Sequence, residues 1–460
     1  MSGRNLTVIG GGLAGCEAAW QAALCGVDVT LCEMRPHRSS PAHKTEMLAE
    51  LVCSNSLRGA ALENAVGLLK EELARLDSLI VGSARASAVP AGGALAVDRE
   101  RFGALVESRL REHPRITVER REATEIPRDR PVIVACGPLP SEILATEIDA
   151  LVGRRLHYYD AASPIVAADS IDESQMYRKS RYDKGDGDDY LNIPLDREQY
   201  LRFVEDVRTL PKHDPEDFEL DLASGKIPYF EGCLPIEEMA ARGEDVLRFG
   251  PMKPVGLRDP RTGKSPYAVV QLRKENVSGT ALNLVGFQTR LTWPAQKEAF
   301  AKLPGLEGAE WLRLGVMHRN AFIDSPRVLT GDLRLRAHPS IRFAGQITGA
   351  EGYVEAAACG AIAGIGAARE MLGLQTLEVP GETALGAVLA HLQNTQTADF
   401  QPANVTWAFV PALERPDAAR LPKRERRRLL AERALDALDG FSRALGRQPA
   451  NATSFLAAGY

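Results

Sequence analysis

The first forty residues alternate between apolar runs and small or polar positions in the order of a strand, a turn, a helix and a second strand. Residues 6–9 form a short apolar run, and residues 14–24 are rich in alanine, as in a helix. Further on, Val27, Val29 and Leu31 alternate with polar or small residues, which is the period of a half-buried strand. The pattern predicts a strand–helix–strand unit at the start of the chain.

Later segments continue this α/β pattern. Helical periodicity covers residues 64–76, and a short apolar run at 131–135 indicates another strand. Near the end of the chain, residues 341–344 have the pattern of a closing strand, which is followed by a glycine-rich turn and a helix of small residues through Gly366. Because these segments flank the middle of the chain, we expect one α/β domain assembled from both ends of the sequence.

The middle of the chain has a different composition. Residues 180–192 are dense in charge and glycine, and residues 225–256 are rich in glycine and proline. This change indicates an inserted domain rather than continued winding of the α/β unit. A basic and then amphipathic helix is expected at 423–438. The predicted domains are a first part of the α/β domain at 1–164, an inserted α+β domain at 165–300, and a second part with the basic C-terminal helix at 301–460.

The turn after the first predicted strand carries the motif Gly10-x-Gly12-x-x-Gly15. In a dinucleotide-binding turn, the first glycine allows the tight turn, the second lets the pyrophosphate approach the backbone, and the third lets the helix pack on the strand. The start of the helix then faces the phosphates. Glu33 ends the second strand 18 residues after Gly15 and can accept hydrogen bonds from ribose hydroxyls. The motif therefore predicts a dinucleotide site, rather than an ordinary glycine turn, formed by Gly10, Gly11, Gly12, Leu13, Ala14, Gly15 and Glu33.

NAD and FAD both fit this motif, and a second glycine-rich turn near the end of the chain favours FAD. Residues 344–353 repeat the order of strand and glycine turn before a small-residue helix. Two-part flavoprotein folds bring the chain back to the flavin at such a turn. The helix at 356–366 is almost all alanine and glycine, so it can lie close to the cofactor, although tight packing in the core explains the same composition. The predicted FAD contacts in this segment are Gly345, Gln346, Gly352 and Tyr353.

The composition excludes several classes of protein. The 460 residues carry a net charge of −5, which argues against a globally basic nucleic-acid coat. No run of 18 apolar residues predicts a membrane span, and the N-terminus lacks the leader of a signal peptide, so we expect a soluble cytoplasmic protein. The seven cysteines are scattered without a C-x-x-C pair, so no metal site is expected.

One segment is strongly basic despite the negative net charge. Between Arg420 and Arg433 there are seven basic and two acidic residues. Such a cluster fits binding to RNA phosphates, and a solvated helix face explains it equally well. The candidate RNA-binding residues are Arg424, Arg426, Arg427 and Arg428.

Longer motifs occur in order over nearly the whole chain, among them VIGGGLAGCEAAWQAALCGVDVTLCEMRP, HKTEMLAELVCSNSLRG, SRYDKGDGDDYLN, YFEGCLPIEEMAARG, LRFGPMKPVGL, GVMHRN, GQITGAEGYVEAAACG and FQPANV. Together they resemble the folate- and flavin-dependent tRNA (uracil-5-)-methyltransferases, the TrmFO family, which is related to the GidA flavoproteins. The resemblance implies a GidA-like fold, with a Rossmann-type FAD-binding α/β domain and an inserted α+β domain. It implies no obligate protein partner.

The resemblance also implies a reaction. The methylene carbon of 5,10-methylenetetrahydrofolate passes to C5 of uridine 54 in the T-loop of tRNA, and the product is ribothymidine. NAD(P)H reduces the FAD, which supplies the electrons and carries the carbon at N5.

This reaction needs a reactive thiol, because C5 of uracil becomes nucleophilic once a thiolate adds to C6, and a base must then remove the C5 proton. Cys233 lies in a loop flanked by glycine and proline, which suits a thiol that reaches a flipped base, and Cys53 lies in a polar turn that can abut the flavin. The resemblance assigns Cys233 as the nucleophile and Cys53 as the proton-transfer thiol, while the residues alone leave these roles exchangeable. The other five cysteines lie in apolar patterns typical of inert core thiols.

The folate is expected beside the flavin. His318 is a candidate for stacking on the pterin, although a hydrogen-bonded structural histidine fits equally well. Arg290 is a candidate partner for the glutamate of the folate. Tyr229 and Phe230, close to Cys233 in the sequence, are candidates to receive the flipped uridine.

Three other functions fit parts of the sequence. A GidA-like enzyme acting on wobble uridine shares the flavin and folate chemistry, but such proteins have an additional C-terminal helical region. An NAD(P)H-dependent flavin oxidoreductase acting on a small molecule needs neither Cys233 nor the basic cluster. A non-catalytic RNA-binding protein with a vestigial flavin fold needs no reactive cysteine. The identity of the modified nucleotide and the binding of tRNA distinguish these alternatives.

Overall fold

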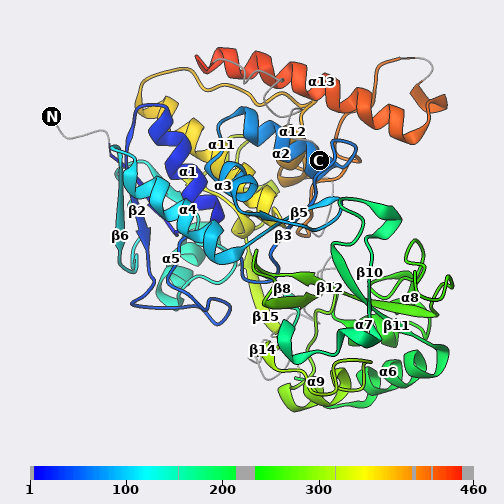
Figure 1. Cartoon of the computed structure of the whole chain (residues 1–460). Helices are drawn as coiled ribbons and strands as arrows, with labels where there is room; N and C mark the ends of the chain where they lie inside the picture. The colour runs from blue at the N-terminus through cyan, green and yellow to red at the C-terminus, as the bar shows by residue number, and fades with distance from the viewer. Residues whose placement is uncertain are drawn as a thin grey trace.

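The computed structural model describes residues 5–153, 155–213, 234–315, 317–395, 400–415 and 418–447. These residues form two lobes, a larger one that contains both ends of the described chain and a smaller one formed by its middle (Figure 1). None of the helices in these ranges combines the length and the apolar character needed to cross a membrane.

The larger lobe is built on a six-stranded sheet with the strand order β16-β17-β7-β1-β2-β6. Neighbouring strands from β17 to β6 are parallel, whereas β16 is antiparallel to β17. Thr7, Val8 and Ile9 of the central strand β1 are successive residues and all are buried, as expected for a parallel strand covered on both faces. The strands are β1 (Asn5–Ile9), β2 (Asp28–Glu33), β6 (Ile116–Arg120), β7 (Val132–Val134), β16 (Arg334–Leu335) and β17 (His338–Phe343). The strands expected at 6–9, 131–135 and 341–344 are thus confirmed.

Helix α1 (Leu13–Leu24) packs along α11 (Tyr353–Met371), which comes from the other end of the chain. A Cβ atom at Gly360 would lie 2.2 Å from the carbonyl oxygen of Ala14, so the two backbones can approach this closely only at a glycine. The small residues expected as a helix at 356–366 therefore serve the packing of α11 on α1. The other helices of this lobe are α2 (Ala65–Arg75), α3 (Leu79–Ala86), α4 (Arg99–Glu112), α5 (Glu142–Val152), α10 (Ser325–Val328), α12 (Ala384–Leu392) and α13 (Lys423–Ala444).

A small antiparallel sheet borders the larger lobe where it meets the smaller one, with the strand order β3-β5-β4. Its strands are β3 (Ser56–Gly59), β4 (Ala88–Val89) and β5 (Ala94–Val97). The loop that carries Cys53 leads directly into β3, so this sheet fixes one side of that loop.

The smaller lobe is an antiparallel sheet with the strand order β10-β11-β12-β13-β9-β14, packed against short helices. Phe203, Phe287 and Phe300 are buried and touch one another in its core. The elements are β9 (Ile165–Ala167), β10 (Tyr177–Arg178), β11 (Tyr190–Leu195), α6 (Arg197–Thr209), α7 (Ile236–Ala241), α8 (Val246–Phe249), β12 (Ala268–Lys274), β13 (Ala281–Leu284), α9 (Trp293–Phe300) and β14 (Trp311–Arg313). A lobe of antiparallel strands and helices is α+β in character.

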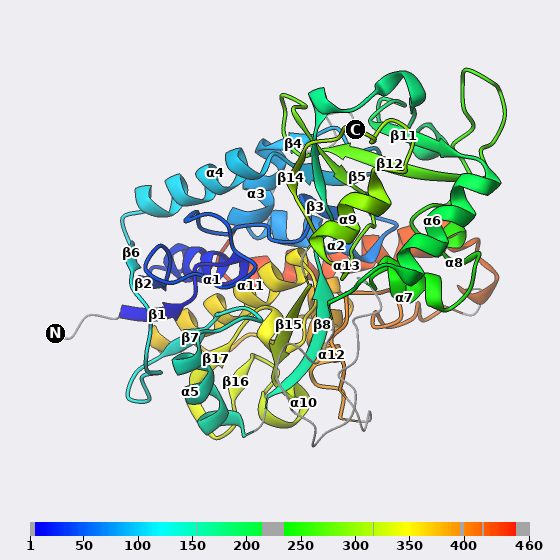
Figure 2. The ribbon, with the colours of Figure 1, turned by 90° about the horizontal axis from the view of Figure 1, so that it is seen from below.

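Two adjacent strands connect the lobes. β8 (Leu156–Ala161) leaves the larger lobe and β15 (Met317–Phe322) returns to it, and the two pair antiparallel along their whole length (Figure 2). The Ala321 N–H donates to the Pro138 carbonyl and the Ile323 N–H to the Ile347 carbonyl, each at 2.8 Å. The returning strand is therefore fixed beside the turns that follow β7 and β17, where the parallel strands end.

Candidate active site

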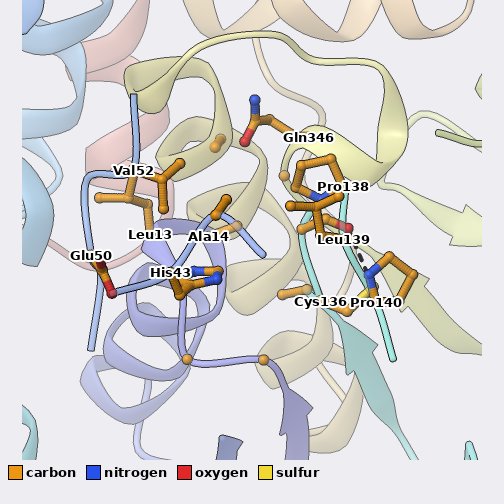
Figure 3. A pocket seen from close by; sticks show the side chains of 18 of the residues that line it. Leu13, Ala14, His43, Glu50, Val52, Cys136, Pro138, Leu139, Pro140 and Gln346 are labelled. Atoms are coloured by element: carbon orange, nitrogen blue, oxygen red, sulfur yellow. Dashed lines mark hydrogen bonds between the residues drawn. The ribbon is translucent and has the colours of Figure 1, made fainter. Parts of the chain in front are cut away.

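A pocket of about 310 Å³ opens at the carboxyl ends of β1, β2 and β7. This is the edge of a parallel sheet at which α/β proteins bind their ligands. In Figure 3, Leu13 and Ala14 at the start of α1 lie between Val52 on one side and Pro138 and Gln346 on the other. Ten of the eleven residues predicted to contact the cofactor line the pocket: Gly10, Gly11, Gly12, Leu13, Ala14, Glu33, Gly345, Gln346, Gly352 and Tyr353.

The remaining predicted residue, Gly15, does not line the pocket and instead packs against the backbone of the turn. A Cβ atom at Gly15 would lie 1.8 Å from the carbonyl oxygen of Gly10. Gly10 itself has a φ of +106°, and its Cβ would lie 2.4 Å from the carbonyl oxygen of Ala135. Both positions thus exclude any side chain, which explains why the motif has glycine there.

The open side of the same turn fits a phosphate. Gly12 is the N-cap of α1 and supplies no side-chain cap, and a Cβ built there meets no atom within 4 Å. The first N–H groups of a helix have no partner within the helix, and they attract anions together with the helix dipole. The turn therefore has a shape and polarity that suit an anion, and its contact with a pyrophosphate stays a prediction.

Glu33 lies at the carboxyl end of β2 and is almost fully buried. Its carboxylate accepts hydrogen bonds from the Gly11 N–H at 2.7 Å and from the Arg35 Nε at 2.8 Å. Burial works against ionisation, but the contacts with Arg35 and Gly11 outweigh it and lower the pKa of Glu33. Arg35 also pairs with Glu50 at 3.1 Å, and neither Arg35 nor Glu50 was predicted from the sequence. Glu33 therefore fixes the glycine turn in addition to facing the pocket.

Tyr353, the first residue of α11, brings the far end of the chain to Cys53. Its hydroxyl accepts the N–H groups of Cys53 at 2.8 Å and of Ser54 at 3.1 Å, and it lies 2.9 Å from the Cys53 Sγ. A phenol oxygen that accepts two N–H groups is left to donate its own proton to the sulfur. Burial and the neighbouring Cys53 raise the pKa of Tyr353, so the hydroxyl keeps this proton.

Two arginines hold the residues that precede Cys53. Arg99 of α4 donates to the carbonyl of Leu51 at 2.5 Å, and Arg313 of β14 donates to the carbonyl of Val52. These contacts span 48 and 261 positions of the sequence. The loop is thus fixed from both lobes.

A third arginine holds the residues that follow Cys53. Arg273 of β12 donates to the Oδ1 of Asn55 at 2.8 Å and to the Oγ of Ser54 at 3.0 Å. The amide of Asn55 donates in turn to the Val97 carbonyl of β5 at 3.0 Å. Asn55 thus anchors the loop to strands of both lobes.

Known proteins similar to this chain cover almost all of it. Residues 5–375 match the family described as glucose inhibited division protein A. The chain is 56% identical over 436 residues to the methylenetetrahydrofolate--tRNA-(uracil-5-)-methyltransferase TrmFO of Citrifermentans bemidjiense, which covers 95% of this chain and 98% of that protein. It is 57% identical over 438 residues to the protein of the same name from Pelobacter propionicus, with 95% and 94% covered. The chain belongs to the TrmFO family.

The fold agrees with this membership. GidA of Aquifex aeolicus matches the structure with a TM-score of 0.67 and 16% identity, over 95% of this chain and 76% of that one. At this identity the likeness shows the fold alone, and it confirms the predicted GidA-like α/β class with an additional domain. The resemblance to the TrmFO family that the motifs indicated is confirmed by the relatives of matching length.

Three further residues were predicted from the sequence to act on the uridine. Cys233 lies outside the described residues, as do Tyr229 and Phe230. The structure describes the chain up to His213 and again from Leu234. Residues on both sides hydrogen-bond to the backbone of residues 288–290, and Gln288 lines the pocket. The His213 N–H donates to the Arg290 carbonyl at 2.8 Å, and the Ile236 N–H donates to the Gln288 carbonyl at 2.9 Å.

The two candidate folate residues differ in what the structure shows. The backbone of His318 belongs to β15, and its side chain is outside what the structure describes. Arg290 pairs with Glu238 at 2.8 Å and does not line the pocket. Neither prediction is tested by this geometry.

The basic residues of this TrmFO-family chain lie in the first turns of α13. Arg424, 87% exposed, pairs with Glu63 at 2.9 Å, and Arg428 pairs with Glu432 at 2.9 Å. Leu430 and Leu438 of the same helix are buried against the larger lobe. The helix is thus amphipathic as expected, with its basic start projecting from the lobe.

Three other cysteines of the described chain have a pKa that burial raises. Burial raises the pKa of Cys16 above its usual range, and it raises the pKa of Cys136 and of Cys359 to about 12. They are thiols, as expected for inert core residues, although Cys136 also lines the pocket. Among the residues described, no cluster of His, Cys, Asp and Glu has the arrangement of a metal site.

Proposed function

We propose that this chain methylates C5 of uridine 54 in the T-loop of tRNA, with carbon from 5,10-methylenetetrahydrofolate and electrons from NAD(P)H that pass through FAD. Membership in the TrmFO family makes the chain an FAD- and folate-dependent tRNA (uracil-5-)-methyltransferase. The observation that carries the proposal is a single pocket with a dinucleotide cradle at Gly10 to Ala14 and a cysteine thiol, Cys53, on its wall.

The lining of the pocket fits FAD. The bare N-terminus of α1 would hold the pyrophosphate, and the ionised Glu33 would accept a ribose hydroxyl. Gly345, Gln346, Gly352 and Tyr353 would border the rest of the cofactor. When bound, FAD supplies the electrons that convert the transferred methylene into a methyl group.

The protein's own part in the reaction falls to two thiols. In our proposal the thiolate of Cys233 adds to C6 of the uracil, which gives C5 the electron density to attack the methylene carbon. Cys53 then removes the proton from C5. The hydrogen bond from the Tyr353 hydroxyl fixes the Cys53 sulfur at the pocket wall, so a base at this position is held in one orientation.

Other residues would bind the substrates. His318 would stack on the pterin and Arg290 would meet the glutamate of the folate from the side of the smaller lobe. Arg424, Arg426, Arg427 and Arg428 would contact tRNA phosphates. We assign residues 1–164 and 301–460 to the FAD-binding domain and residues 165–300 to the inserted domain, with β14 of the second part pairing with the sheet of the inserted domain. The protein would act in the cytoplasm without an obligate protein partner.

Transfer of labelled methylene tests the proposal. The purified protein is incubated with FAD, NADPH, labelled 5,10-methylenetetrahydrofolate and an unmodified tRNA transcript, and the nucleosides are analysed. We expect labelled ribothymidine from the wild type and from the control Cys25→Ala, but none from Cys233→Ala. Product from Cys233→Ala would remove Cys233 as the nucleophile. Oxidation of NADPH without any labelled nucleoside would favour a flavin oxidoreductase.

A further inference from the structure

The loop that carries Cys53 is surrounded by more positive than negative charge. Arg273 and Glu275 are almost fully buried, and Arg99 and Arg313 are mostly buried. Glu275 pairs with Arg99 at 2.7 Å and is the carboxylate of this group. Three guanidinium groups therefore share one carboxylate around the loop.

Buried cations without a matching anion are costly, because they lose hydration that nothing replaces. The Nη2 of Arg99 and the Nε of Arg313 are buried and donate to no acceptor among the described residues, and the Oε1 of Glu275 is buried there without a donor. Burial and the charge of Arg99 lower the pKa of Arg313, and the negative forms of Tyr353 and Cys53 act in the opposite direction. The arrangement therefore favours a further negative charge in contact with the loop.

Two ionisable groups meet at this place, the thiol of Cys53 and the hydroxyl of Tyr353. A thiol loses its proton about 1.5 pH units below a phenol in water. The Tyr353 hydroxyl accepts two N–H groups and is left to donate to the Cys53 Sγ at 2.9 Å. A donor directed at sulfur stabilises the thiolate and not the thiol. The negative charge therefore belongs on sulfur.

We propose that Arg99 and Arg313 are positioning residues that keep Cys53 as a thiolate in the resting enzyme. They act in two ways: they bind the carbonyl groups of Leu51 and Val52, the two residues before Cys53, and their positive charges interact with its sulfur. On ionisation the thiol proton passes to solvent and the electron pair stays on sulfur. The thiolate is then ready to take a proton, forming S–H.

This inference rests on the proposed function only for the source of that proton. In the proposed reaction the proton comes from C5 of the uracil, and the C–H electron pair stays on the ring. Two other charged groups border the pocket: Arg58 pairs with the buried Glu355, and Arg35 pairs with Glu33 and Glu50. The field at Cys53 thus comes mainly from Arg99, Arg273, Arg313 and Glu275.

The ionisation of Cys53 can be measured without tRNA or folate. FAD-loaded enzyme is alkylated with iodoacetamide over a range of pH, and the rate at Cys53 is read from its peptide by mass spectrometry. We expect the rate to rise with a midpoint below about pH 7, whereas an unperturbed cysteine gives about 8.5. In Arg99→Met and in Arg313→Met the midpoint should rise by about one pH unit.

Further variants separate the effect of the arginine charge on the midpoint from the effect of the side-chain shape. Arg99→Lys and Arg313→Lys keep the charge and should keep most of the low midpoint. Glu275→Gln removes the one carboxylate and should lower the midpoint further. Arg101→Met, on the exposed face of the same helix α4, should leave it unchanged.

Three results would overturn the inference: a wild-type midpoint near 8.5, methionine variants with the wild-type midpoint, or a rise in Glu275→Gln. If the methionine variants fail to bind FAD, the wild-type midpoint and the Glu275→Gln shift still decide. A low midpoint in an enzyme that transfers no methylene to tRNA would instead contradict the proposed function and leave the thiolate assignment in place.

Discussion

The glycine turn after β1 and the loop of Cys53 border the same pocket, yet different forces hold them. The turn comes from six consecutive residues, and its shape is fixed by backbone contacts too close for any side chain, such as that between Gly15 and Gly10. The Cys53 loop is held by arginines from α4, β12 and β14 and by a tyrosine from α11. The turn should therefore respond to added volume, and the loop to lost hydrogen bonds or charge.

The largest effect is expected from added volume in the turn. In Gly15→Ala the new Cβ would lie 1.8 Å from the Gly10 carbonyl oxygen, which neither backbone can avoid without moving. We expect unfolding to become easier by about 3 kcal/mol and FAD binding to be lost. Denaturant unfolding and flavin fluorescence measure both.

Gly12→Ala is the matched control, because its Cβ meets no protein atom within 4 Å. This variant should keep its stability within about 0.5 kcal/mol and bind FAD more weakly, since the methyl group points into the cradle. Equal stability of the two variants would contradict the steric account of the turn.

A smaller effect is expected from lost hydrogen bonds at the loop. Tyr353→Phe keeps the ring but leaves the N–H groups of Cys53 and Ser54 without their acceptor. We expect a loss of about 2 kcal/mol in the free energy of unfolding, because two donors lose their partner. The exposed Tyr182→Phe is the control and should change stability by less than about 0.5 kcal/mol. A Tyr353→Phe variant as stable as this control would show that the hydroxyl does not hold the loop.

Glu33 is an exception to this contrast, because its charged side chain stabilises the glycine turn through hydrogen bonds from Gly11 and Arg35. Its pKa is lowered by folding, so its contribution is complete above the pKa of an unfolded glutamate, near 4.3, and disappears as the pH falls through the lower folded pKa. Glu33→Gln should cost about 1 kcal/mol at pH 7, and the difference from wild type should shrink below about pH 4. A difference that grows on acidification would have the wrong sign.

The smallest effect on stability is expected from a substitution in α13, whose residues do not line the pocket. Arg427→Gln should leave FAD binding and the unfolding free energy unchanged within about 0.5 kcal/mol. If the side chain contacts a phosphate, tRNA binding weakens and the slope of log affinity against log salt falls by about one. An unchanged slope would assign the basic turn to a solvated helix face.

The same contrast explains how much the sequence could predict. Gly10, Gly12, Gly15 and Glu33 belong to one strand–helix–strand unit, so spacing alone revealed them, as it did the strands β1, β2, β7 and β17; the contact of Gly10 with Ala135 was visible only in the structure. The composition of the helix at 356–366 had two explanations, and the structure favours packing, because Gly360 lies against the Ala14 carbonyl. Motif similarity, rather than spacing, indicated Cys53.

The supports of Cys53 carried no signal in the sequence. Arg99, Arg273 and Arg313 are 48, 218 and 261 positions from the residues they bind, and single arginines at such separations form no motif. Arg35 and Glu50 were missed for a related reason, because their pairing depends on how the segment after β2 folds back. The contacts of Arg273 and Arg313 exist only once both lobes are in place.

The most direct test of the whole account is the position of the label in tRNA after transfer from labelled 5,10-methylenetetrahydrofolate. Three enzymes are compared, the wild type, Cys53→Ala and the control Cys25→Ala, on a transcript with U54 and on one in which U54 is replaced by C. The account predicts label only at U54 and only with the wild type and the control. Label at the wobble uridine, or equal labelling by Cys53→Ala, would contradict it.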